Sequence, residues 1–177
     1  MAEVHIVGGS LGAQQVEQRG RELAEDAVRR LESTARERQL AVTLTPAPRV
    51  HARVARGPAS LVLANLLDNA LKFSPPGSVV RVRIATDGDQ ALLSVTDTGP
   101  GLQGDDQAHL FERFYRGAAA RAGGAPGVGL GLALGLALSQ AIVQAHGGSI
   151  EAVSPASGGA EFTIRFPLAE APTQALR

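Results

Sequence analysis

Three polar side chains share one face of a predicted helix. Asn65, Asn69 and Lys72 are spaced by four and then three residues, inside a helical pattern that begins at Pro58 and ends near Phe73. Such spacings place side chains on the same side of a helix. Two amide oxygens and one ammonium group suit a complex of magnesium with a polyphosphate, because magnesium keeps waters and phosphate oxygens and needs only one or two protein oxygens. For this segment alone, a solvated helix face is an equally good interpretation.

A carboxylate followed by two glycines forms a second motif, Asp97-Thr98-Gly99-Pro100-Gly101, at the end of a predicted strand. The carboxylate can accept a hydrogen bond from an exocyclic amine, and the bare backbone at Gly99 and Gly101 lets a flat ring approach. The motif also fits an ordinary turn that ends a strand. Taken alone, it favours the turn.

A glycine-rich stretch leads directly into an apolar helix. Gly127, Gly129, Gly131 and Leu132 belong to the run GVGLGL, whose backbone amides together with the positive end of a helix favour an anion. The run is neither a P-loop, since no Gly-Lys-Ser/Thr closes it, nor a dinucleotide-binding fingerprint, since no βαβ unit surrounds it. It therefore indicates a phosphate site only in combination with other motifs.

Aromatic and basic residues alternate between the two glycine motifs, in the run FERFYR at residues 111–116. One interpretation is a hydrophobic plug on a short helix. The other is the anchor of a lid, whose Arg113 or Arg116 reaches toward phosphate. The segment of about thirty residues that contains it is long for a loop in a compact domain, which favours a functional lid.

Periodicity predicts the elements that must position these motifs. We expect helices over residues 21–38, 58–73 and up to about 146, a pair of strands at 40–45 and 50–54, and hairpins at 80–84 with 91–96 and at 149–153 with 162–166. This order predicts an α+β protein, a two-layer α/β sandwich whose mixed, mostly antiparallel sheet is covered on one face by about three helices. We expect a loose leader at residues 1–20, the domain at 21–168 and a tail at 169–177.

Composition narrows the function classes. The 177 residues carry 17 basic and 17 acidic side chains, which argues against a general nucleic-acid binder, because phosphate contacts call for a basic surplus. The chain has no cysteine, which excludes disulfides and thiol chemistry and suits the cytoplasm. Residues 122–150 lack charged side chains and carry glycines four apart, as a membrane helix would, but Ser139, Gln144 and His146 interrupt them. We therefore expect no membrane span in this chain.

Together and in this order, the motifs resemble the catalytic ATP-binding domain of bacterial sensor histidine kinases. This domain has the Bergerat ATP-binding fold and belongs to the superfamily that also contains gyrase, the Hsp90 chaperones and the MutL repair proteins. The resemblance covers roughly residues 21–168. It rests on the segments NLLDNALKFSP, DTGPGL, FERFYRG, GVGLGLAL and the closing AHGGSI and GGAEFTIRFPL.

The resemblance implies a role for each matching residue. Asn69 matches the magnesium ligand, and Asn65 an accessory ligand or water-positioning residue. Lys72 matches a residue that contacts phosphate, and Phe73 packs beside the nucleotide. Asp97 matches the aspartate that reads the adenine amino group, with Gly99 and Gly101 shaping that wall. Asn65, Lys72, Arg113 and Arg116 would assist phosphoryl transfer, and the lid would also contain Arg121. The residues that would wrap the triphosphate are Gly127, Gly129, Gly131 and Leu132.

The implied activity is transfer of the γ-phosphate of ATP, with Mg²⁺, to a histidine on a separate dimerisation domain, with a response regulator downstream. The acceptor is absent here, because none of the histidines, at positions 5, 51, 109 and 146, has the sequence context of the family's acceptor. We therefore expect a monomeric catalytic domain, and a membrane anchor in a longer parent protein stays open. Two alternatives are a stand-alone serine kinase of the anti-sigma type, and a degenerate module that keeps the fold but binds a partner instead of ATP.

Two irregularities distinguish this chain from the family pattern. The run GLALGLAL is a tandem repeat, so the glycine triplet and the distance from His146 place the start of the helix four residues apart, at Gly131 and Gly135. Four residues add about one turn, roughly 6 Å of rise. The lead-in at residues 56–61 is also short and lacks the usual acidic residue. We expect both features to affect the lid and the affinity for ATP.

Overall fold

The structure is a computed structural model that describes residues 4–6, 18–45, 50–118, 121 and 128–169. Its helices are α1 (Gly20–Glu37), α2 (Arg56–Phe73), the short α3 (Asp106–His109) and α5 (Val128–Ala145). Its strands are β1 (Val4–Ile6), β2 (Gln18–Arg19), β3 (Ala41–Leu44), β4 (Val50–Ala52), β5 (Val79–Asp87), β6 (Gln90–Thr96), β7 (Ser149–Val153) and β8 (Glu161–Pro167).

A five-stranded sheet forms one layer of the molecule, in the order β3-β5-β6-β8-β7. β3 runs parallel to β5, and the other neighbours are antiparallel. Alternation along the strands sends one set of side chains into the core: Val80, Val82 and Ile84 of β5 are buried, whereas Arg81 and Arg83 between them are exposed. The prediction of a mixed, mostly antiparallel sheet is confirmed.

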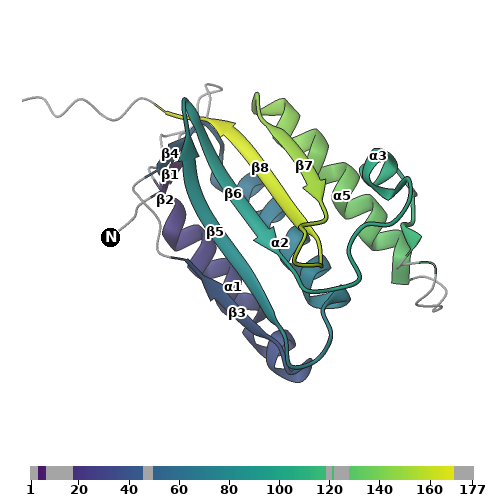
Figure 1. Ribbon diagram of the computed structural model, residues 1–177. Coiled ribbons are helices and arrows are strands. Elements are labelled where there is room, and N and C mark those ends of the chain that lie inside the picture. The colour runs from purple at the N-terminus through teal and green to yellow at the C-terminus, as the bar shows by residue number, and fades with distance from the viewer. Residues whose placement is uncertain (1–3, 7–17, 46–49, 119–120, 122–127, 170–177) are drawn as a thin grey trace, which may run out of the picture.

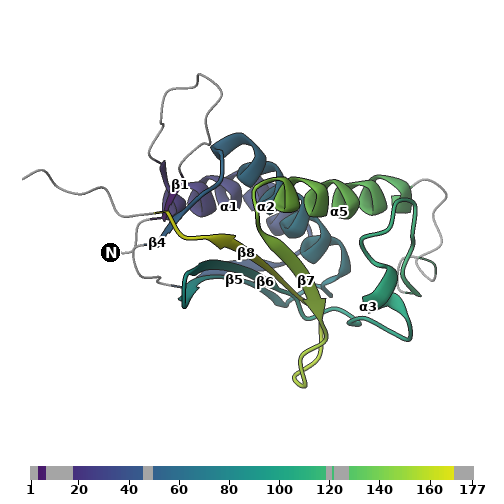
Figure 2. The same ribbon diagram turned by 90° about the horizontal axis from the view of Figure 1, so that it is seen from above.

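The helices α1, α2 and α5 form the second layer and cover one face of this sheet (Figures 1 and 2). α2 lies centrally and is the most deeply buried, with Val62, Leu63, Leu66 and Leu67 almost fully enclosed. It packs against both α1 and α5. The central place of α2 matters for function, because this helix carries Asn65, Asn69 and Lys72.

Three local predictions differ from the structure. β3 and β4 do not pair with each other: β3 joins the large sheet beside β5, and β4 pairs with β1 in a separate small sheet. Residues 4–6 and 18–19, expected in a loose leader, are strands of that small sheet. α2 begins at Arg56, two residues before Pro58, because proline is tolerated within the first turn of a helix.

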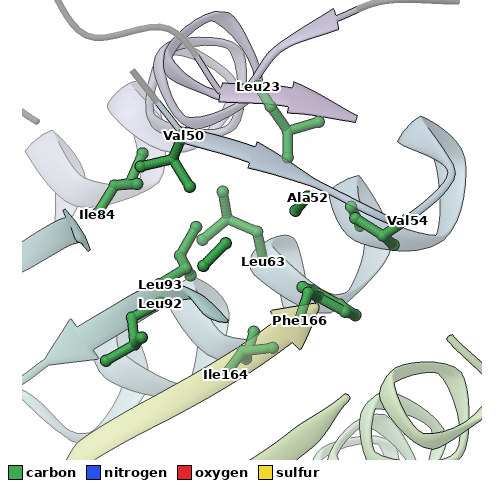
Figure 3. Close-up of a pocket in the computed structure, with 12 residues that line it drawn as sticks. Leu23, Val50, Ala52, Val54, Leu63, Ile84, Leu92, Leu93, Ile164 and Phe166 are labelled. Carbon is green, nitrogen blue, oxygen red and sulfur yellow. The ribbon is translucent and has the colours of Figure 1, made fainter. Parts of the chain in front are cut away.

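An apolar cavity of about 40 Å³ lies where the small sheet and α1 meet the main core (Figure 3). Its wall combines Leu23 of α1, Val50 and Ala52 of β4, and Ile164 and Phe166 of β8. The lining side chains are all apolar, and the labelled ones surround a space between strands and helices rather than a polar cleft. This cavity is therefore a gap in the packing of the apolar core.

The described part of the chain contains no helix that is both long and apolar enough to cross a membrane.

Candidate nucleotide site

Asn69 is a buried residue of α2, only 4% exposed. The described part of the chain shows no hydrogen bond to its side chain, and its amide atoms are not among the fully enclosed polar atoms that lack a partner. An amide oxygen without a fixed partner can serve as a ligand for a cation. Asn69 stays the predicted metal ligand of α2.

Asn65 lies one turn earlier and joins α2 to α5. Its side-chain nitrogen Nδ2 donates to the carbonyl oxygen of Gly135 and to Oγ of Ser139, each at 3.1 Å. The Ser139 hydroxyl in turn donates to the Gly135 carbonyl at 2.7 Å. Because both hydrogen bonds use the nitrogen, the amide is held in one orientation.

Lys72, the only lysine of the chain, forms an ion pair on its own helix. Its Nζ lies 2.5 Å from Oδ2 of Asp68, one turn earlier, and both side chains are partly exposed. Exposed pairs of this spacing contribute about 0.3–0.5 kcal/mol. This weak partner leaves the ammonium group able to exchange Asp68 for a phosphate oxygen.

Asp97 is the buried carboxylate of the site, with 3% of its surface exposed. Its Oδ1 accepts hydrogen bonds from the backbone N–H groups of Gly99, at 2.8 Å, and Ala160, at 3.1 Å. Burial raises the pKa of Asp97 above its ordinary value of 3.8, and these two hydrogen bonds oppose the shift only in part. Within the described residues both bonds go to Oδ1, so Oδ2 is the atom that can receive a ligand N–H.

Gly99 brings the Asp97 loop against the end of α2. A Cβ atom at position 99 would lie 2.7 Å from the carbonyl oxygen of Phe73, closer than real Cβ contacts come. The bare backbone at this position is therefore what lets the two motifs meet. The contact places Asp97 next to the helix that carries Asn69.

The turn between β7 and β8 supports the same loop. Gly159 has φ +79°, and a Cβ there would overlap the Asp97 carbonyl oxygen at 1.9 Å, so only glycine fits. Gly101 packs against the Gly159 carbonyl and Oγ of Ser154, and Ser154 also accepts the Leu102 N–H at 2.7 Å. Gly159 and Ser154 are not among the predicted site residues, although the run of small residues between the last two strands is visible in the sequence.

Asp106 is a second buried carboxylate that the sequence analysis did not identify. Its oxygens accept hydrogen bonds from the N–H of Gln103 at 3.0 Å, the hydroxyl of Tyr115 at 2.9 Å and the N–H of Ala118 at 3.1 Å. Burial raises its pKa, but these hydrogen bonds and the nearby charge of Arg121 outweigh that effect and hold the pKa below 3.8. One carboxylate thus closes the whole segment between residues 103 and 118.

The arginines expected in a lid lie in or just beyond this closed segment. Arg113 is exposed, Arg116 is half-buried, and Arg121 donates to the carbonyl oxygen of Arg116 at 2.6 Å. The two phenylalanines differ. Phe111 packs against the core, as a plug would, whereas Phe114 is 63% exposed with φ +67°. Phe111 therefore fits the interpretation as a hydrophobic plug, and the lid anchor stays a prediction.

Of the glycine motif, Gly129, Gly131 and Leu132 lie within the first turns of α5, and Gly127 lies outside the described residues. The surplus of the GLALGLAL repeat is therefore taken up by a longer helix. Figure 1 shows α3 on the same side of the molecule as the start of α5. The candidate site thus lies among the end of α2, the Asp97 loop and the first half of α5.

The sequence pattern of the histidine kinase-, DNA gyrase B- and HSP90-like ATPases matches residues 56–170, which is more than half of the chain. The chain belongs to this family. The α+β sandwich predicted from the sequence is the fold of this domain.

Named relatives place the chain within one branch of the family. It is 39% identical over 150 residues to the probable sensor histidine kinase TcrY of Mycobacterium tuberculosis, which covers 82% of this chain and 30% of that protein. It is 41% identical over 128 residues to the signal transduction histidine-protein kinase AfsQ2 of Streptomyces coelicolor, which covers 72% of this chain and 22% of that protein. The chain therefore spans less than a third of the length of these relatives.

Solved structures agree with the sequence comparison. A mycobacterial sensor histidine kinase, MprB, superposes with a TM-score of 0.69 and 32% identity, over 86% of this chain and 97% of that one. Full-length ShkA in complex with AMPPNP superposes with a TM-score of 0.72 and 28% identity, over 92% of this chain and 32% of that one. This chain is the ATP-binding catalytic domain of a sensor histidine kinase.

Proposed function

We propose that the domain binds ATP together with Mg²⁺ and donates the γ-phosphate to a histidine on a separate helical dimerisation domain. The observation that carries the proposal is that two buried residues with polar side chains, Asn69 of α2 and Asp97 of the following loop, lie on elements that touch each other. The Asn69 amide has no partner among the described residues, and the Asp97 carboxylate has its free oxygen on the loop that Gly99 packs against the end of α2.

The residues present fit a magnesium–phosphate complex. The described residues contain no group of three or more His, Cys, Asp or Glu side chains able to hold a metal. A magnesium ion here would thus be held by Asn69, with Asn65 nearby, and by phosphate oxygens and waters, which suits an ion that keeps its waters. Such an ion would neutralise charge on the phosphates.

The remaining residues divide the work of recognition. Asp97 accepts a hydrogen bond from the amino group of adenine, and Phe73 packs beside the base. Gly99 and Gly101 leave room for the adenine ring. Lys72 contacts phosphate, and the backbone at Gly127, Gly129, Gly131 and Leu132 surrounds the phosphate chain. Arg113, Arg116 and Arg121 add positive charge from the lid.

Phosphoryl transfer makes modest demands on such a site. The bond from the γ-phosphorus to the bridging oxygen of ADP breaks, a bond to an imidazole nitrogen forms, and the imidazole proton passes to a base. Positioning and neutralisation of charge supply most of the acceleration, so no nucleophile is required from this domain. We propose the cytoplasm as its compartment, a response regulator as the downstream partner, and a monomer as the state of the isolated domain.

Calorimetric titration of ATP, with and without Mg²⁺, tests the binding step. We expect binding by the wild type that depends on Mg²⁺, and a loss of at least about thirtyfold in Asn69→Ala and Asp97→Asn, since each removes a buried polar contact to the ligand. Asp105→Asn, which changes an exposed carboxylate in the following loop, is the matched control and should bind as the wild type does.

A second assay tests the acceptor. Radiolabelled ATP is mixed with the domain and a histidine-bearing dimerisation domain from a similar kinase. A product that is labile in acid and stable in alkali is phosphohistidine, and its formation supports the proposal. A folded wild type that fails to bind ATP would refute the proposal, and an acid-stable product on serine would show the wrong acceptor.

A further inference from the structure

The tandem repeat of this chain lies in the first half of α5, beginning at its fourth residue. Its units are Gly131-Leu132-Ala133-Leu134 and Gly135-Leu136-Ala137-Leu138. Both are helical, inside a helix of 18 residues that begins at Val128. The units have the same sequence but different neighbours, and their neighbours decide which unit faces the nucleotide site.

Asn65 makes its contacts with the glycine of the second unit, Gly135. Its Nδ2 donates to the carbonyl oxygen of Gly135 and to Oγ of Ser139, and the Ser139 hydroxyl, whose residue is 0% exposed, donates to the same carbonyl. A Cβ at Gly135 would lie 3.5 Å from Cγ of Asn65, so α5 approaches α2 closely at this point. These three residues, the α2–α5 pin, fix the register of α5 against the helix that carries Asn69.

The pin places the free amides of α5 away from Asn65. In an α-helix the N–H groups of the N-cap and of the first three helical residues lack an intrahelical partner, and within the described part of α5 these belong to residues 128–130. The N–H of Gly135 is used by the helix itself. The nearest free amide, that of Leu130, therefore lies five residues from Gly135, or more than one turn and about 7.5 Å along the axis. Without the repeat, the glycine that ends the triplet would itself lie at the pin.

We propose that the repeat is a one-turn spacer that lowers the affinity of this site for the phosphate chain of ATP and leaves recognition of the nucleoside unchanged. The proposal deepens the function proposed above and rests on it. Asp97, Gly99 and the end of α2 are untouched by the spacer, so the adenosine part binds normally. The phosphates reach the α5 amides only when the first turn of α5 unwinds or shifts, and this change opposes binding.

Deletion of Leu132–Gly135 tests the spacer, because it joins Gly131 to Leu136 and returns a glycine to the pin. Affinities for Mg-ATP and for AMP are measured by calorimetry on the wild type and the deletion variant. We expect ATP to bind at least about tenfold more tightly to the deletion variant, and AMP to change by less than about twofold. Leu134→Ala, which alters an exposed side chain of the repeat but not its length, should leave both affinities unchanged.

Insertion of a third Leu-Ala-Leu-Gly unit after Gly131 provides a variant with the opposite change, in case the deletion variant fails to fold. We expect it to bind ATP more weakly than the wild type and AMP equally well. ATP affinities that are the same in wild type, deletion and insertion variants would overturn the spacer, as would a change shared equally by AMP. If folded wild type binds neither nucleotide, the proposed function itself fails, which is a distinct result.

Discussion

At the scale of single residues, two buried carboxylates respond to pH in opposite ways. Asp97 and Asp106 are each 3% exposed. Burial dominates at Asp97 and raises its pKa, whereas at Asp106 the effect of burial is outweighed by hydrogen bonds and by the charge of Arg121, which lower the pKa. The first accepts hydrogen bonds from described residues through Oδ1 alone, whereas both oxygens of the second accept hydrogen bonds from residues 103–118.

Asp106→Asn should destabilise the protein in a way that depends on pH. An asparagine cannot accept all the hydrogen bonds that Asp106 receives, and the loss should cost about 2–4 kcal/mol at pH 7. Because the pKa is lowered by folding, the stability due to the carboxylate is present above pH 3.8 and disappears as the pH falls through the lower, folded-state pKa. Urea unfolding should therefore show that the free energies of unfolding of the wild type and the variant come closer together as the pH is lowered from 7 to 3. A difference that stays constant would contradict this role.

Asp97→Asn should abolish ATP binding without loss of stability. The raised pKa means that the folded protein holds a proton more tightly than the unfolded chain, so Asp97 lowers the free energy of unfolding as the pH rises above 3.8. At pH 7 the variant should be as stable as the wild type or more stable. The same urea series measures this, and marked destabilisation at pH 7 would show that Asp97 is mainly structural.

At the scale of elements, the β7–β8 turn supports the Asp97 loop, although the two are far apart in the sequence. Gly159→Ala would place a Cβ on the Asp97 carbonyl oxygen. The substitution should lower the free energy of unfolding by at least about 3 kcal/mol, and it should also abolish ATP binding. Gly158→Ala is the matched control: its φ is +89°, but nothing lies within 4 Å of the added Cβ, so it should cost only about 1–2 kcal/mol and keep ATP binding. Thermal melts measure the stability of the two variants, and calorimetry measures their affinity for ATP. Equal losses in both variants would contradict the contact between Gly159 and the Asp97 carbonyl.

At the scale of the whole molecule, the apolar cavity beside the small sheet lowers stability, and none of its lining residues belongs to the candidate nucleotide site. Ala91 of β6 lines the cavity of about 40 Å³, and it is 5% exposed. Ala91→Val should fill part of this space with a side chain suited to a strand, and raise the free energy of unfolding by about 0.5–1.5 kcal/mol. ATP affinity should not change. A melting temperature of the variant below that of the wild type would show that the cavity cannot accept the larger side chain.

Much of the candidate site could be predicted because its groups are carried by local patterns. The spacing of Asn65, Asn69 and Lys72 fixes their common helix face, and the Asp97 motif follows directly from the end of a strand. Alternation and helical periodicity predicted the strands and helices in the same way, since each pattern is contained within one element.

What the sequence left undecided depends on contacts between distant residues. Nothing local indicates that β3 pairs with β5 instead of β4, because a short strand carries no record of its partner. The role of Asp106 appears only when residues 103–118 fold back on one carboxylate. The repeat in α5 offers two equal registers, and the choice between them rests on a hydrogen bond from Asn65, 70 positions away. The sequence by itself therefore determined which groups are available and on which elements, and tertiary packing decided which of them meet.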